Sequence, residues 1–197
     1  MKLVAEVPEV ASVLADPKVK IVIDDGRRWL RLNRGRQFDV IVSNTTWYFR
    51  ANVTNLLSTD FLELIKRHLR PGGVFFNNTT SSDRVQRTGC LAFPYGARFT
   101  NHMVVSASPI VWDFERWRHT LEAYRIDGQP VLDPGSVEDR EALDRLISFE
   151  TSLGTNAIPS AQKPIESCTE ILARTEGKAP VTDDNMGSEW RHYFRFE

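Results

Sequence analysis

Two polar clusters, each directly after a short apolar run, are the residues best suited to chemistry in this sequence. Asp24-Asp25-Gly26 follows the run from Val19 to Ile23, and Ser43-Asn44-Thr45-Thr46 follows the run from Phe38 to Val42. A carboxylate beside a glycine can accept hydrogen bonds from an amine or a hydroxyl while a flat ring approaches the backbone. The two clusters therefore predict a site for a small molecule.

Simpler interpretations of both clusters stay open. The two carboxylates could only cap a helix that begins near Arg27, because negative charge is favoured at a helix N-terminus. The cluster over 43–46 could be a turn whose side chains satisfy backbone groups. The sequence alone does not choose between these roles and a binding role.

The elements that must position these clusters alternate between helix and strand. Apolar runs rich in β-branched residues are typical of strands buried on both faces. In chain order we expect a helix over 2–15, a strand over 19–23, a helix over 27–32, a strand over 38–42, a helix over 58–69 and a strand over 74–76. This alternation predicts an α/β fold with a mostly parallel sheet and flanking helices. Ligands of such sheets bind at the carboxyl ends of the strands, where both clusters fall.

The second half of the chain is expected to be mainly helical. A further strand is predicted over 103–111, and helices over 113–124, 136–149 and 164–174. We treat residues 1–197 as one domain, with a Rossmann-like portion over 1–112 and a helical portion over 113–197.

Composition narrows the class of protein. A formal net charge of -1 and a charged content of 26% give no basic excess of the kind that nucleic-acid binders carry. No apolar run reaches the length of a membrane helix. Cys90 and Cys168 form no CxxC pattern, so we expect neither a disulfide nor a zinc site and a cytoplasmic location. The four histidines lack ligand spacing, so no metal is expected. The expected partners are small molecules, and a homo-oligomer stays open.

The stretches "VKIVIDDGRRWL" at 19–30 and "FDVIVSNTTWYFRANVTNLLSTDFLELIKRHLRPGGVFFNNTT" at 38–80 resemble the spermidine synthase (polyamine aminopropyltransferase) family, a class I S-adenosylmethionine-type Rossmann domain. The tail "VTDDNMGSEW" at 181–190 is a second point of likeness. The resemblance implies that Asp25, next to Asp24 and Gly26, faces the adenine amino group of S-adenosylmethionine or its decarboxylated form. It also implies that Ser43 and Asn44 lie beside this nucleoside, and that Thr45, Thr46, Trp47 and Tyr48 lie beside an amine acceptor.

The sequence departs from the family pattern at several positions. Asn44 stands where the family has its catalytic aspartate, and an amide cannot act as a base at neutral pH. Trp47 replaces a second acidic residue, so a cationic acceptor would meet an aromatic face. The glycine-rich first strand of the family does not precede Val19. We therefore expect a truncated domain without its first two strands, whose place could be filled by re-pairing or by a complementing chain.

Asp183 and Asp184 allow three roles: binding a cation, forming a loop turn, or covering the ligand cleft as a lid. For the whole chain three hypotheses stay open. The first is an aminopropyltransferase-like enzyme of polyamine biosynthesis. The second is a methyltransferase-like enzyme, because the residues at 44–47 loosely match an amine-orienting loop. The third is a non-catalytic fragment or binding module.

Overall fold

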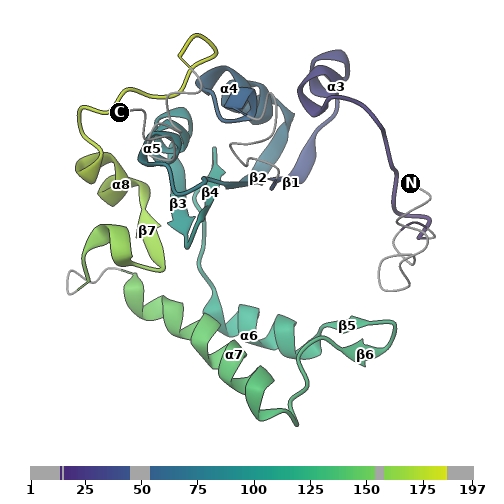
Figure 1. The fold of residues 1–197 in the computed structure, drawn as a ribbon. Coiled ribbons are helices and arrows are strands. Elements are labelled where there is room, and N and C mark those ends of the chain that lie inside the picture. The colour runs from purple at the N-terminus through teal and green to yellow at the C-terminus, as the bar shows by residue number, and fades with distance from the viewer. Residues whose placement is uncertain (1–13, 15, 45–53, 154–157, 186–197) are drawn as a thin grey trace, which may run out of the picture.

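The computed structural model describes residues 14, 16–44, 54–153 and 158–185 of the chain. Its main feature is a five-stranded sheet in the order β1-β2-β4-β3-β7, flanked by helices (Figure 1). The α/β class predicted from the sequence is confirmed. The strands of this sheet are β1 (Phe38–Ser43), β2 (Leu69–Asn78), β3 (Tyr95–Phe99), β4 (His102–Ser106) and β7 (Ile165–Ser167).

Strand direction in this sheet is mixed. β1 and β2 pair in parallel, as predicted, with Ser43 opposite Asn77. β4 is antiparallel to both β2 and β3, and β7 is antiparallel to β3, so β1, β2 and β3 all run the same way. Only Thr100 and Asn101 separate β3 from β4, and so short a connection can join only antiparallel neighbours. Most strands of the sheet thus run in one direction, as predicted. Most neighbouring strands nevertheless pair in antiparallel fashion, which was not predicted.

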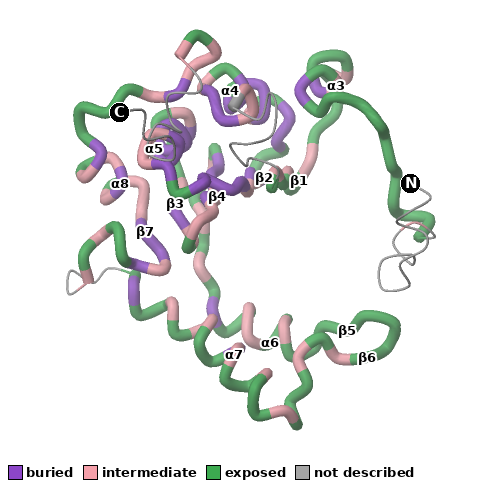
Figure 2. Tube along the Cα trace, viewed as in Figure 1, coloured by how far each residue is buried: buried purple, intermediate pink, exposed green. Residues whose placement is uncertain are grey.

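Helices cover one face of the sheet and enclose the main core. They are α3 (Gly26–Leu32), α4 (Thr59–His68), α5 (Asp83–Ala92) and α8 (Cys168–Arg174). The apolar face of α4 buries Phe61, Leu64 and Ile65 in a cluster that also holds Phe75 and Val105, which face each other across β2 and β4. Buried positions concentrate in α4, α5 and the central strands (Figure 2).

Two helices and a hairpin form a separate lobe. α6 (Phe114–Ala123) and α7 (Val137–Ile147) lie side by side, away from α3 and α4, and β5 (Arg125–Ile126) and β6 (Gln129–Pro130) form a small hairpin (Figure 1). In the described part of the chain, short 3-10 helices span Thr54–Leu56, Ser148–Ser152 and Ser160–Gln162. Both long helices begin as predicted, because Asp113 and Ser136 accept hydrogen bonds from backbone N–H groups of the first turn.

The strand predicted over Val19 to Ile23 is wrong. These residues form neither helix nor strand, and Ile23 is 86% exposed. An apolar run becomes a strand only where a neighbouring strand takes up its backbone hydrogen bonds, and no described strand lies beside this one. β1 is consequently an edge of the sheet, and the prediction that it is buried on both faces is also wrong: Val40 is 56% and Val42 63% exposed.

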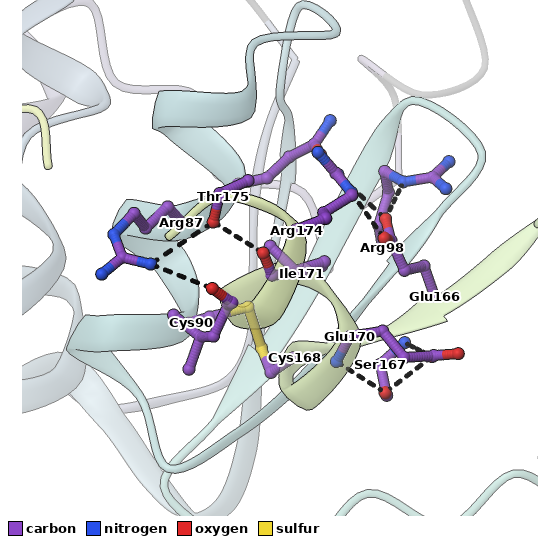
Figure 3. Close-up of a disulfide and its surroundings, with 12 residues drawn as sticks. Arg87, Cys90, Arg98, Glu166, Ser167, Cys168, Glu170, Ile171, Arg174 and Thr175 are labelled. Carbon is purple, nitrogen blue, oxygen red and sulfur yellow. Dashed lines mark hydrogen bonds and ion pairs between the residues drawn. A yellow bond between two sulfur atoms is a disulfide. The ribbon is translucent and has the colours of Figure 1, made fainter. Parts of the chain in front are cut away.

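A disulfide joins α5 to α8, contrary to the expectation of two unpaired cysteines. Cys90 and Cys168 are 78 positions apart in the sequence, but α5 packs against α8, and their Cα atoms lie 5.3 Å apart (Figure 3). Gly96 on β3 makes room for this bridge, since a Cβ atom there would lie 3.1 Å from Cys168 Sγ. Disulfides persist mainly in oxidising compartments, so this bridge counts against the predicted cytoplasmic location, which stays a prediction.

Charged side chains fix β7 and α8 to the rest of the domain. Glu166, fully buried, accepts hydrogen bonds from Arg98 at 2.9 Å and from Arg174 at 2.6 Å (Figure 3). Arg174 also reaches Asp83 at the start of α5, at 2.5 Å. A buried carboxylate needs such partners, because an unpaired charge in the interior is costly. The helix predicted over 164–174 is thus correct only from Cys168 onward, since residues 165–167 form β7.

Candidate functional site

The carboxyl ends of β1 and β2 bring the predicted site residues to one edge of the sheet. The two strands are parallel, so Ser43 and Asn77, which pair in register, lie at the same edge. α3 leads into β1 and α4 leads into β2, and each of these helices runs in the direction opposite to the strand that follows it. α5 begins just after β2 ends. The N-termini of all three helices therefore lie at this edge, which we call the carboxyl edge. Ligands of α/β sheets bind there.

Asp24 and Asp25 lie at the N-terminus of α3. Asp25 caps this helix: its Oδ1 accepts a hydrogen bond from the backbone N–H of Arg28 at 2.7 Å. Both oxygens of Asp24 accept from Arg28 Nη1 at 2.7 Å, and this hydrogen bond lowers the pKa of Asp24. Asp25 is exposed, and among the described residues its Oδ2 has no hydrogen-bond partner. Helix capping thus accounts for Oδ1 of Asp25, whereas Oδ2 could accept a hydrogen bond from a ligand.

Asn44 lies directly after β1 and belongs to a chain of three amides. Its Oδ1 accepts a hydrogen bond from Asn78 Nδ2 at 3.1 Å, and Asn78 Oδ1 accepts one from Asn101 Nδ2, also at 3.1 Å. Asn44 is exposed while Asn78 is buried, so the chain of amides leads from the interior to the surface of the carboxyl edge. Thr45, Thr46, Trp47 and Tyr48, which were predicted to bind substrate, lie outside the described residues.

The turn between β2 and α5 completes this polar group. Thr80 and Ser81 have φ angles of 56° and 57°, which non-glycine residues adopt rarely, and such backbone conformations concentrate at functional sites. Their N–H groups donate to Asn78 Oδ1 and Asn101 Oδ1 at 2.8 and 2.7 Å. Sequence reasoning did not assign Asn78 or Asn101 to the site. The Asn-Asn-Thr-Thr run after β2 was a signal for Asn78, whereas nothing in the sequence marked Asn101.

Asp183 is held by side chains of α3 and of the turn before α4. It forms a two-point ion pair with Arg27 and accepts a hydrogen bond from Ser58 Oγ at 2.6 Å. The hydrogen bond from Arg27 is the main reason that the pKa of Asp183 is lowered. A hollow of about 350 Å³ opens beside the pair, lined by Arg27, Arg31, Thr59, Asp60, Glu63, Leu64, Arg67 and Asp183. Asp184 next to it is exposed. The observed contacts of Asp183 thus connect the segment near residue 183 to α3 and to the start of α4. Its role in binding a ligand stays a prediction.

A larger, apolar hollow lies on the sheet face opposite α4 and α5. It has a volume of about 730 Å³ and is bounded by aromatic side chains, among them Phe76, Phe99, Trp112 and Trp117. Phe76 stacks on His102, with ring centroids 4.9 Å apart, and burial lowers the pKa of His102. His102, which stacks on Phe76 of this hollow, directly follows Asn101 in the sequence. The hollow was not predicted from the sequence, because its walls come from distant segments.

The described residues offer neither a metal site nor a membrane-spanning helix. Within the part of the chain that the structure describes, no three His, Cys, Asp or Glu side chains gather closely enough to hold a metal ion. Across the same residues, no helix combines the length and apolar character needed to cross a membrane.

Comparison with known proteins agrees with the resemblance noted above. One similar crystal structure is that of a probable spermidine synthase from Corynebacterium glutamicum, with a TM-score of 0.48 and 16% sequence identity; the likeness covers 89% of this chain and 60% of that one. At these values we draw no conclusion from it. Residues 5–87 match the family model described as the spermine/spermidine synthase domain, and this range holds Asp25, Asn44 and Asn78. This segment is less than half of the chain, and through it the chain is similar to the spermidine synthase family.

Proposed function

We propose that this chain is a spermidine synthase-like transferase domain that binds an S-adenosylmethionine-derived nucleoside at the carboxyl edge. In this proposal the free oxygen of Asp25 accepts a hydrogen bond from the adenine amino group, and Gly26 lets the ring approach the backbone. Ser43 and Asn44 lie beside the nucleoside. Thr45 to Tyr48, with Asp183 and Asp184, face an amine acceptor. Decarboxylated S-adenosylmethionine is the expected aminopropyl donor, with no metal involved.

One observation carries the proposal. Asp25 lies at the N-terminus of α3 and Asn44 directly after β1, at the same edge of the sheet, and both belong to the segment that matches the family model. The carboxylate at 25 keeps one oxygen without a partner among the described residues. A capping residue alone needs only the first oxygen, so the second is suited to a ligand.

The residue at position 44 limits the chemistry. Transfer requires the acceptor amine to lose a proton, and an amide cannot remove it at neutral pH. If the chain transfers an aminopropyl group, the amine must arrive deprotonated or another group must take its proton. For this reason the second candidate function is a binding module without catalysis, and Asn44 is the observation that favours it.

Titration calorimetry with three nucleosides tests the proposal. We expect decarboxylated S-adenosylmethionine to bind more tightly than S-adenosylmethionine, with methylthioadenosine as the product-like control. A preference for S-adenosylmethionine instead would support a methyltransferase-like protein. Binding of nucleosides without turnover of any amine would support the binding module. No heat with any of the three would overturn the nucleoside site.

A further inference from the structure

The apolar hollow of about 730 Å³ lies between the sheet and the separate lobe. Successive residues of a strand point to opposite faces, so Phe76 faces away from α4 because Phe75 lies in the main core beside α4. Val104 pairs with Phe76 across β2 and β4 and therefore shares this face. The lobe lies on the side of the sheet away from α4 and α5 (Figure 1), and its helix α6 supplies Trp117 and Leu121 to the other wall.

Contacts among aromatic side chains hold these walls in place. Phe114 on α6 is 3% exposed and shares a buried cluster with Ala97 of β3, which fixes α6 to the sheet. The ring centroid of Trp117 lies 4.8 Å from that of Phe114 and 5.8 Å from that of Trp112. Phe99 of β3 contacts Trp117 with centroids 6.0 Å apart. Apolar and aromatic walls with a few polar groups, around a volume of this size, are typical of small-molecule pockets.

One guanidinium that lines the hollow has no partner among the described residues. The polar lining consists of Asp113, Arg116 and Thr120, which all belong to α6 or its cap. Asp113 Oδ1 accepts a hydrogen bond from the backbone N–H of Arg116 at 2.8 Å, and a negative charge is favoured at a helix N-terminus. The Arg116 side chain is exposed and forms no hydrogen bond or ion pair with a described residue. Among the residues that line the hollow, the charge that no other group compensates is thus positive.

We propose that this hollow binds an apolar carboxylate, whose body lies between the aromatic walls and whose carboxylate group is held by Arg116. A guanidinium presents a planar fork of donors that matches the two oxygens of a carboxylate. An apolar ligand with an ammonium group would instead meet the uncompensated charge of Arg116 and is disfavoured. The site goes beyond the proposed function, because it lies on a face of the sheet and uses neither Asp25 nor Asn44.

Three probes of nearly equal shape test the assigned ligand class: 2-naphthoate, 2-naphthylmethanol and 2-naphthylmethylammonium. In calorimetric titrations of the whole chain, naphthoate should bind about fivefold more tightly than the alcohol, since one exposed ion pair is gained. The ammonium compound should bind more weakly than the alcohol. Equal affinities, a preference for the ammonium compound, or no saturable binding of naphthoate would overturn the proposal.

Arg116→Gln tests the role of the guanidinium. The variant should lower the affinity for naphthoate to that for the alcohol and leave the affinity for the alcohol unchanged. Arg118→Gln is the matched control, because it removes the same charge from α6 two positions further on, at a residue that does not line this hollow. It should leave all three affinities unchanged. Full affinity of Arg116→Gln for naphthoate would overturn the proposal.

Leu121→Trp tests the place of binding. The larger ring should occupy part of the hollow and weaken all three probes about tenfold. Circular dichroism checks that the variant is folded, and full naphthoate affinity in the folded variant would overturn the proposal.

A competition experiment separates this site from the proposed nucleoside site. Saturating methylthioadenosine should leave the affinity for naphthoate unchanged, and displacement of the probe would overturn the proposal. Failure of every nucleoside to bind would count only against the proposed function.

Discussion

Arg27 and Asp183, 156 positions apart in the sequence, form a two-point ion pair with N···O distances of 2.9 and 2.5 Å. Arg27 is only 6% exposed. Asp183 also accepts a hydrogen bond from Ser58, whose Oγ caps α4 by accepting one from the N–H of Phe61. One carboxylate near the end of the described chain therefore connects α3 to the N-terminus of α4.

Loss of this carboxylate should destabilise the fold. We expect Asp183→Ala to lower the free energy of unfolding by roughly 2 to 4 kcal/mol, because it leaves the buried guanidinium of Arg27 without its charged partner. The cost is below that of a fully buried pair, since the Asp183 side chain is 36% exposed. Urea unfolding followed by circular dichroism measures it. Asp184→Ala, at the exposed neighbouring position, is the control and should change stability by less than about 0.5 kcal/mol. Equal losses in the two variants would contradict the assigned role.

Glu166 should make stability depend on acid pH. Burial raises the pKa of Glu166, but hydrogen bonds from Arg174, Ser160 and Arg98 outweigh it, and the pKa lies below its ordinary value of 4.5. A carboxylate whose pKa is lowered by folding stabilises the protein above the unfolded-state pKa. This contribution is lost as the pH falls below about 4.5 and through the lower folded-state value.

Glu166→Gln tests this contribution. The variant should lose roughly 3 kcal/mol near pH 7, because two arginines lose their shared partner. It should also show a weaker decline in stability as the pH falls below about 4.5, the ordinary pKa of this carboxyl group, because the variant has no carboxylate to protonate there. Unfolding curves at several pH values provide the measurement. Glu141→Gln, on the exposed surface of α7, should follow the wild-type curve. Full wild-type acid dependence in the Glu166→Gln variant would exclude Glu166 as a source of it.

Reduction of the Cys90–Cys168 bridge should also destabilise the protein. The bridge closes a loop across a separation of 78 positions, for which chain entropy gives a stabilisation of roughly 4 kcal/mol. We expect a Cys90→Ser/Cys168→Ser variant to unfold at lower urea concentration than the oxidised protein and at the same concentration as the reduced one. Mass spectrometry after alkylation, without a reducing agent, checks that the bridge is present. Free thiols in the native protein would contradict it.

Two variants at position 25 separate helix capping from ligand binding. Asparagine caps helices about as well as aspartate, so Asp25→Asn should change stability by less than about 0.5 kcal/mol. Asp25→Ala should lose about 1 kcal/mol because the cap is removed. Under the proposed function both should weaken nucleoside binding at least tenfold, since both lack the second carboxylate oxygen. Asp24→Asn should weaken it less, because both oxygens of Asp24 already accept from Arg28. Calorimetric titration distinguishes these outcomes, and full binding by Asp25→Asn would rule out the carboxylate.

Prediction from the sequence was most accurate for helices whose signals all lie within one short segment. The helix expected over 58–69 is observed as α4 because its cap, its apolar face and its stop all lie within one segment. The same holds for α6 and α7, whose capping residues precede a helical apolar period. Asp25 caps α3, as the alternative interpretation of its cluster predicted, whereas the strand expected before it is absent from the described structure.

Features that depend on distant partners were not predicted. Val19 to Ile23 has the composition of a strand but no described neighbour with which to pair, and composition carries no information about neighbours. The bridge between Cys90 and Cys168 depends on the packing of α5 on α8. Asn101 joins the site only because a tight hairpin returns it beside Asn78. Each of these relations is set by tertiary packing.

The space at Gly96 also links two positions that are far apart in the gene. A methyl group at residue 96 would meet Val105 Cγ1 at 2.8 Å and Cys168 Sγ at 3.1 Å, so even alanine would press against the sulfur atom that closes the bridge. A lineage that acquires a side chain at 96 should therefore also tend to lose the cysteine at 168, while one that keeps the cysteine should retain glycine. The two codons are thus expected to vary together among descendants of this gene.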